Sequence, residues 1–452
     1  MDNPVELPSS YPGVSDTANI AKLKIDEVIL DSQLIALIQI AINNNQDVLI
    51  ALQRINAARA NFQQNRLALL PSLLLETSAG VTRYADHTID GVGNFDTNLS
   101  HNIPEDKLIP TPTPDYFIGF TSSWEIDIWG KLRNHKKAAH ARYLSSEKGR
   151  HLIITNLIAE VAMHYYTLLT LDAELEIIQN NITLQEAAVE TARLLKEGGK
   201  TNELAVSQLM AQLLNSRGLK IKTEQTIIET ENRLNVLLGR LPQPINRGKT
   251  LMEQEIPAYI SAGIPSEMLI NRPDLQMAEL ELIASKADLH AARAAFLPSF
   301  TINAYSGLNA FATSALFSTP GSIAYGLMSG LTAPIFNRKL ISANFRFAEA
   351  NRNEAYYNYQ KRIITGFTEV TTSLKSLENL EKINKLKQEE VDELERGVTT
   401  SNQLFQMGYA SYLDVINAQR NVLIAELELA NNKKEQLTSL ITLYKALGGG
   451  WK

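Results

Sequence analysis

The feature that most constrains the fold of this chain is an internal repeat. Residues 47–80 and 274–307 align without a gap at an offset of 227, and ten of the 34 positions are identical. The identical pairs are Asp47/Asp274, Ala51/Ala278, Ala57/Ala284, Ala60/Ala287, Arg66/Arg293, Ala68/Ala295, Leu70/Leu297, Pro71/Pro298, Ser72/Ser299 and Gly80/Gly307. The repeat resumes at an offset of 209 with Gly199/Gly408, Leu204/Leu413 and Val206/Val415. The chain is therefore built as two halves on one plan.

Each half is predicted to contain a helix, two strands and two long helices. Pro71 and Pro298 end the helices that precede the first strands, because proline disfavours the helical conformation in the residue before it. In the first half we expect a helix at 31–70, strands at 73–82 and 116–126, a polar loop at 85–114, and helices at 130–196 and 203–238. In the second half we expect a helix at 273–297, strands at 300–308 and 323–332, and long helices ending at Met407 and Gly448.

These elements predict a division of the chain into consecutive segments. They are an extended N-terminal arm at 1–30, a first structural repeat at 31–240, a connector at 241–272 and a second structural repeat at 273–452. The strand-bearing segments, 72–128 and 299–335, are expected to form a membrane β-barrel. The first half carries roughly 20 additional residues, all between its two strands, and insertions of this kind collect in exposed loops.

The strands alternate between apolar side chains on one face and Gly, Ser, Thr or Asn on the other, which is typical of a transmembrane barrel wall. Strands of about ten residues, tilted near 45°, match the hydrocarbon core of a bilayer. Four strands cannot enclose a lumen, and lipid does not tolerate an open sheet edge. Three copies would supply twelve strands. A soluble sandwich also shows alternation, and a coiled-coil rod also contains long helices, but neither explains strands, helices and repeat together.

Composition excludes several classes of function. The net charge of −6 predicts no nucleic-acid partner. The chain has no cysteine, so no disulfide or thiolate chemistry is expected, and none of its seven histidines forms a paired metal-ligand motif. Gly199-Lys200-Thr201 imitates the end of a phosphate-binding loop, but Leu194 stands where the first glycine belongs and no strand precedes it. We expect no catalytic residue, metal or cofactor. The N-terminus has no signal-peptide pattern, and no apolar run reaches the length of a spanning helix.

Six sequence blocks, in order, resemble those of outer-membrane efflux channels of the TolC superfamily, in its OprM/NodT-like lipoprotein branch. They are Ser123-Trp124-Glu125-Ile126-Asp127-Ile128-Trp129-Gly130, Asn271-Arg272-Pro273-Asp274-Leu275, Ala295-Phe296-Leu297-Pro298, Pro334-Ile335-Phe336-Asn337, Gly408-Tyr409-Ala410-Ser411-Tyr412-Leu413-Asp414-Val415 with Ala418-Gln419-Arg420, and Leu443-Tyr444-Lys445-Ala446-Leu447-Gly448-Gly449-Gly450-Trp451. The resemblance covers residues 10–452. Branch members usually begin with a lipid-modified cysteine, which this sequence lacks. We expect Met1 to stand at or before that position, and the alternative is a member that is not acylated.

The resemblance implies a mainly α protein: a homotrimer with a 12-stranded β-barrel in outer-membrane lipid, a periplasmic α-helical barrel and an equatorial collar. It implies a passive exit duct of a tripartite efflux or export system, in the outer membrane of a Gram-negative bacterium and extending into the periplasm. The expected partners are a periplasmic adaptor, or membrane fusion protein, and an inner-membrane pump of the RND type. Multidrug and metal export both fit such a duct.

The glycine-broken turns at 198–205 and 407–417 lie at the ends of the long helices that are far from the strands in sequence. Such reversals expose unpaired backbone groups that a partner hairpin can engage. We therefore expect an adaptor-docking tip formed by Gly199, Lys200, Thr201, Asn202, Gly408, Tyr409, Ala410 and Ser411.

By resemblance, the last turn also carries a periplasmic gate, formed here by Leu413, Asp414 and Asn417. In a trimer each becomes a ring of three, and a ring of carboxylates attracts cations and opposes anions. The alternative for Asp414 is a surface acid stabilised by the helix dipole. Ala205 occupies the equivalent position in the first half, so a mouth of six carboxylates is excluded.

Two other classes of function compete with the exit duct. A periplasmic adaptor or coiled-coil scaffold without a pore would bridge membranes, but it should carry a lipoyl-like domain of short glycine-rich strands, which this sequence lacks. A soluble helical enzyme would need a catalytic site, and the sequence offers none. The exit duct is the reading that the repeat, the strands and the helices favour together.

Overall fold

The computed structural model describes residues 7–11, 25–257 and 262–451. It divides the chain into two compact units. We call them the helical unit, Met1–Asn56, Leu144–Leu280 and Tyr356–Lys452, and the sheet unit, Ala57–Tyr143 and Glu281–Ala355.

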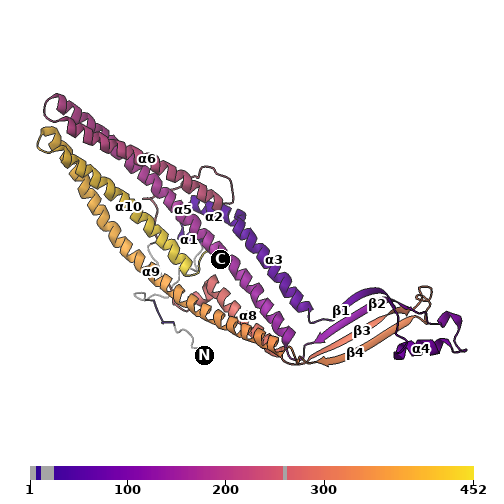
Figure 1. The fold of residues 1–452 in the computed structure, drawn as a ribbon. Coiled ribbons are helices and arrows are strands. Elements are labelled where there is room, and N and C mark those ends of the chain that lie inside the picture. Colours follow the sequence, from indigo (N-terminus) through magenta and orange to yellow (C-terminus); the bar gives the residue numbers. More distant parts are fainter. Residues whose placement is uncertain (1–6, 12–24, 258–261, 452) are drawn as a thin grey trace. The chain divides into compact units, whose positions relative to one another are not determined.

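The sheet unit contains the four strands predicted from the sequence. They are β1 (Ser72–Thr82), β2 (Thr113–Ile126), β3 (Ser299–Ala310) and β4 (Ile323–Thr332). They form one antiparallel sheet in the order β1-β2-β3-β4, with β1 and β4 at its edges (Figure 1). One row of partners runs Ser72, Ser123, Asn303 and Met328. Each half of the repeat therefore contributes one antiparallel strand pair, and β2 joins β3 to unite them.

The segment between β1 and β2 is not the plain loop that we expected. It contains helix α4 (Ile89–Asn98) and a short 3-10 helix, η2 (Glu105–Lys107). The Thr88 hydroxyl accepts a hydrogen bond from Gly91 N at 3.2 Å and so caps α4. Its sequence is rich in Gly, Asp and Asn, residues that disfavour helices, and none of its residues is buried. The Thr88 cap is therefore the local feature that favours this helix, and composition alone did not indicate the helix.

The long helices are confirmed. They are α5 (Lys131–Glu197) and α6 (Glu203–Leu237) in the first half, and α9 (Arg338–Met407) and α10 (Tyr412–Ala446) in the second. At 1.5 Å per residue, the 67 residues of α5 span about 100 Å. Contrary to the expectation from the sequence, α5 and the bent pair α2–α3 contain, among the described residues, stretches long and apolar enough to cross a membrane. Of the α5 stretch, 61% is buried inside the protein.

The single helix expected at 31–70 is wrong: the structure has α2 (Ser32–Asn44) and α3 (Gln46–Leu67), bent by 40°. Asn45 makes the break, because its side-chain oxygen accepts hydrogen bonds from Asp47 N and Val48 N at 2.9 and 3.3 Å. Its amide group donates to the Leu237 carbonyl at the end of α6, at 2.9 Å. A partner about 190 residues away thus fixes the bend, and nothing local to 31–70 could reveal it.

The remaining helices are short or belong to the second repeat. Helix α8 (Pro273–Ala294) is the predicted equivalent of α3, and α7 (Glu267–Asn271) lies in the connector expected at 241–272. The N-terminal arm contains α1 (Ile25–Val28), so its last part is not extended as predicted, and residues 1–6 and 12–24 lie outside the described structure. Tyr11 is buried in the helical unit, with its ring stacked 5.4 Å from Phe367.

Candidate channel wall and helix tips

The two faces of the sheet differ in chemistry as predicted. Residues that face one way are apolar and strongly exposed, between 66% and 77%: Leu73, Leu75, Val81, Leu327 and Leu331. The opposite face carries mostly small or polar residues, such as Ser72, Thr121, Asn303 and Gly330, together with the apolar side chains of Leu74 and Met328. Exposing such an apolar face to water costs about 25 cal/mol for each Å² of apolar surface. The sheet is therefore suited to a wall between lipid and a polar lumen.

Aromatic rings cover glycines on the polar face. Gly119 and Gly307 are directly paired, and a Cβ on Gly119 would lie 2.5 Å from the Gly307 Cα. The Phe117 ring lies over this pair and meets Tyr305 edge to face at 6.2 Å. Tyr305 in turn covers Gly326, where an added Cβ would lie 2.4 Å from the ring. Glycine is required here because backbone and ring occupy the space of a side chain, and the packing fixes the strand register.

Trp124 and Trp129 form hydrogen bonds to the turns that precede β1 and β3. The sequence analysis did not assign this role to them. The Trp124 indole donates to the Leu69 carbonyl at 3.0 Å, and the Trp129 indole donates to the Pro298 carbonyl at 2.7 Å. Leu69 and Pro298 lie at the helix-to-strand turns of the first and second repeats. Indole rings of this kind prefer the interface between lipid and water.

Asp127 starts α5. Its carboxylate accepts hydrogen bonds from Leu132 N at 3.0 Å and Arg133 N at 2.9 Å, and it forms an ion pair with the Arg133 side chain at 3.1 Å. Asp127 thus fixes the direction in which the long helix leaves the sheet.

The first predicted tip is a tight turn between α5 and α6. Gly199 has a φ of +71°, which only glycine adopts without strain, and a Cβ there would meet nothing within 4 Å. The Lys200 amide donates back to the Leu195 carbonyl at 2.8 Å, which closes the end of α5. Asn202 caps α6 by accepting from Ala205 N at 3.2 Å. Lys200 and Asn202 are exposed and Thr201 is partly exposed.

The second predicted tip repeats this geometry between α9 and α10. Gly408 has a φ of +81°, and the Tyr409 amide donates to the Leu404 carbonyl at 2.9 Å. Tyr409 is 82% exposed, the largest exposed side chain of the turn. Ala410 is partly buried, and Ser411 is exposed and caps α10.

The three predicted gate residues, Leu413, Asp414 and Asn417, lie in the first two turns of α10, and all three are exposed. Asp414 and Ser411 form a capping box: Ser411 donates to the Asp414 carboxylate from its amide at 2.8 Å and from its hydroxyl at 2.7 Å. These bonds hold the pKa of the Asp414 carboxyl below its usual range. The carboxylate is therefore ionised at neutral pH and also supports the start of the helix.

Both tips pack into one apolar cluster of the helical unit. Val206 from the first hairpin and Phe405 and Val415 from the second are buried in it, and Ala410 and Tyr412 pack against it. The structure thus brings together the two turns that lie 209 residues apart in sequence. The exposed parts of both turns project from a shared apolar cluster.

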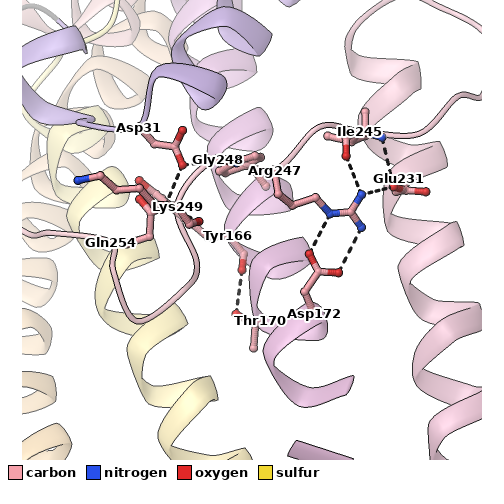
Figure 2. Close-up of polar contacts among 11 residues, drawn as sticks. Asp31, Tyr166, Thr170, Asp172, Glu231, Ile245, Arg247, Gly248, Lys249 and Gln254 are labelled. Atoms are coloured by element: carbon pink, nitrogen blue, oxygen red, sulfur yellow. Dashed lines mark hydrogen bonds and ion pairs between the residues drawn. The ribbon is translucent and has the colours of Figure 1, made fainter. Parts of the chain in front are cut away.

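A buried polar network holds the connector after α6 (Figure 2). Asp31 caps α2 and also accepts hydrogen bonds from the Tyr165 hydroxyl at 2.9 Å and the Gln254 amide at 2.8 Å. Gly248 N donates to the same Tyr165 hydroxyl at 2.8 Å. Burial, together with the Asp31 carboxylate, raises the pKa of Tyr165, which therefore stays a neutral donor. The network fixes the connector against α5.

An ion-pair cluster continues this network along the connector. Arg247 pairs with Asp172 on α5 at 2.8 Å and with Glu231 on α6 at 2.5 Å (Figure 2). Among the described residues, no group of three or more His, Asp or Glu side chains could hold a metal ion.

Comparison with known proteins decides the family. The sequence matches the outer membrane efflux protein family over residues 37–240 and 264–449. The chain belongs to this family. It is 29% identical over 451 residues to the solvent efflux pump outer membrane protein SrpC of Pseudomonas putida, covering 98% of this chain and 91% of that protein. It is also 29% identical over 425 residues to the probable outer membrane lipoprotein SilC of Salmonella typhimurium, covering 93% and 87%.

A solved structure shows the same fold. A membrane protein of Pseudomonas aeruginosa superposes with a TM-score of 0.88 at 25% identity, over 98% of this chain and 95% of that one. The family, the fold class, the outer-membrane location and the role as an efflux channel are thereby confirmed, and the alternative of an adaptor without a pore is not supported. Members of the family are transport channels rather than enzymes.

Proposed function

We propose that three copies of this chain close a 12-stranded barrel and form the exit duct of a tripartite efflux system. The observation that carries the proposal is the four-stranded sheet, which has one exposed apolar face and two edge strands, β1 and β4. In lipid an unpaired strand edge is too costly to persist, so each β4 must pair with β1 of another copy. The proposed partners are a periplasmic adaptor and an inner-membrane pump of the RND type.

We also propose how the segments divide this task. Residues 72–128 and 299–335 form the barrel, and the first repeat (31–240) and the second repeat (273–452) supply the rest of the duct. The long helices of both repeats build the periplasmic α-barrel. The N-terminal arm and the connector, which the Asp31 network fastens to α2 and α5, form the collar.

The gate is proposed to be the ring of Leu413, Asp414 and Asn417 at the start of α10. All three side chains are exposed and lie within two turns of one helix, as a constriction requires. An apolar ring closes a pore by excluding water, and an acidic ring adds a barrier to anions. Partner binding can open such a ring only if the closed state is favoured by a few kcal/mol.

The test of channel and gate is single-channel recording in planar bilayers, with the particle mass measured in detergent. Wild type should be a trimer of low conductance, and Leu413→Ser should raise that conductance severalfold. Asp414→Asn, which keeps an oxygen toward Ser411, should reduce cation preference while leaving the particle trimeric. A monomer without channels would overturn the proposed function. Unchanged conductance and selectivity in both variants would place the gate elsewhere.

The docking tip is proposed to be the pair of turns Gly199–Asn202 and Gly408–Ser411. Exposed aromatic side chains dominate many interfaces, and the Tyr409 side chain in the second turn is 82% exposed. Tyr409→Ala should therefore weaken binding of the purified adaptor by about tenfold or more. Tyr357→Ala is the matched control, because Tyr357 is 66% exposed on α9 and outside both turns. Equal losses in the two variants, or none in Tyr409→Ala, would remove the tip from the docking surface.

A further inference from the structure

The helix ends that adjoin the strands carry a concentration of positive charge. Residues 131–146, at the start of α5, contain five lysines and arginines and no acidic residue, whereas the whole chain has a net charge of −6. Residues 338–348, at the start of α9, contain three and again no acidic residue. The efflux function does not require this distribution.

Within the sheet unit, part of this charge lines a cavity of about 450 Å³ between α3 and α5. Its lining is Phe62, Arg133, Lys136, Lys137 and His140. The Phe62 and His140 rings lie 4.9 Å apart and form one wall. Every polar side chain of the lining is basic, and no carboxylate contributes. The cavity therefore combines an apolar wall with an electropositive interior, which suits an anion attached to an apolar body.

Within the described part of the chain, two of these cations, Lys136 and Lys137, have no ion-pair partner. Arg133 pairs with Asp127 at 3.1 Å, and further along α5 Arg142 pairs with Asp288 at 2.6 Å. Among the ion pairs of the described residues, none includes Lys136 or Lys137. Both lysines line the same cavity and like charges repel, so a bound anion would reduce the repulsion. The charge of the cavity is therefore available to a ligand.

The position of the cavity relative to the strands indicates the source of that anion. Lys136 and Lys137 lie five and six residues into α5, about 8 to 9 Å from its start. Because α5 leads away from the sheet, its side chains tilt back toward the strands. The headgroup layer of a bilayer extends roughly 5 to 7 Å beyond the hydrocarbon core on each side. With the strands in the membrane, the two lysines would therefore lie close to the level of the lipid phosphates, where basic clusters bind anionic lipids.

We propose that this cavity binds the phosphate of an anionic glycerophospholipid from the periplasmic leaflet of the outer membrane. Lys136 and Lys137 contact the phosphate, and the Phe62 and His140 rings pack against the glycerol and the first acyl carbons. The proposal rests on the proposed function in one respect, because it requires the strands to lie in the membrane. It adds a lipid site that positions the wall at a defined depth in the bilayer.

The test is native mass spectrometry of the full chain, purified in detergent and titrated with dioctanoyl phosphatidylglycerol. K136Q/K137Q should weaken the apparent affinity about thirtyfold, or about fivefold for each lysine. K222Q/K361Q removes two exposed lysines from α6 and from the part of α9 in the helical unit, and it should bind as wild type does. Dioctanoyl phosphatidylcholine should bind far more weakly than phosphatidylglycerol. Equal affinity of wild type and K136Q/K137Q, or equal affinity for the two lipids, would overturn the proposal.

Two further measurements distinguish the possible sources of the anion and separate this proposal from the proposed function. Inorganic phosphate at 10 mM should leave phosphatidylglycerol bound to wild type, whereas its complete displacement would assign the site to free phosphate and overturn the lipid proposal. Trimer mass and conductance should be the same in wild type and K136Q/K137Q. Unchanged lipid binding in a variant that still conducts refutes the lipid site alone. A wild-type chain that neither trimerises nor conducts refutes the proposed function instead.

Discussion

Glu426 makes the stability of the helical unit depend on pH. Its carboxyl lies half-buried on α10, and burial, with a smaller contribution from the Glu395 carboxylate on α9, raises its pKa from 4.5 to about 7. A carboxyl whose pKa is raised by folding contributes its full stability below the unfolded pKa. That contribution is lost as the pH rises through the folded pKa. The helical unit should therefore lose stability between pH 4.5 and about 7.

The size of this loss follows from the same shift. Each pKa unit corresponds to about 1.4 kcal/mol, so the shift sets an upper bound of roughly 3 kcal/mol. Solvent screening of a half-exposed group reduces this to about 1 to 2 kcal/mol. Glu426→Gln removes the charge, and it should raise the apparent melting temperature at pH 8.5 by about 2 to 6 °C. At pH 5, where Glu426 is already protonated, the variant should melt within about 1 °C of wild type.

The assay is thermal unfolding in detergent at pH 5 and pH 8.5, at one protein concentration. Glu428→Gln is the matched control, because Glu428 is exposed on the same helix and pairs with Lys387 at 2.8 Å. Its removal relieves no burial, so it should produce no gain at either pH. An equal gain for Glu426→Gln at both pH values, or no gain at pH 8.5, would show that the buried charge does not determine this stability.

Two substitutions test the polar anchors of the helical unit by the same melting assay. Arg272→Leu removes the partner that the buried Asp274 carboxylate binds at 2.8 Å, and it should lower the free energy of unfolding by about 3 to 5 kcal/mol. R272L/D274L should recover part of this stability. Equal melting temperatures of the two variants would contradict this account. Gly248→Ala places a Cβ 2.4 Å from the Asp31 carboxylate and should cost about 1 to 3 kcal/mol. Gly218→Ala, which meets nothing within 4 Å in α6, should be neutral or stabilising, and similar losses in both alanine variants would argue against the Asp31 contact.

The strands and the ends of the helices that precede them could be predicted because their signals are local. Alternation of side chains depends on a period of two residues, and Pro71 and Pro298 end the preceding helices wherever the chain later travels. The turns at Gly199 and Gly408 were predictable for the same reason, since a φ near +71° or +81° calls for glycine. In each case a few adjacent residues contain the whole physical cause.

The bend at Asn45 and the tryptophan anchors were not predictable, because each depends on a distant partner. Asn45 resembles any polar helix residue until the Leu237 carbonyl is brought to its amide group. Trp124 and Trp129 lie in a recognisable sequence block, but their acceptors are carbonyl groups of other segments, which have no signature in sequence. The Ser411–Asp414 capping box, in contrast, depends only on a local spacing of three residues, so the sequence is sufficient to predict it.

The repeat makes the two tips alike in shape and different in charge. Asn202 and Ser411 are equivalent caps, but the residue three positions later is Ala205 in one and Asp414 in the other. Lys200 stands where the second tip has Tyr409. In the proposed trimer, six similar turns would therefore alternate between a basic tip and an aromatic, acidic one. A partner with six equal hairpins could match the shape of this ring. The charges of the ring would nevertheless distinguish two classes of docking site. The register of docking would therefore be set by electrostatics rather than by shape.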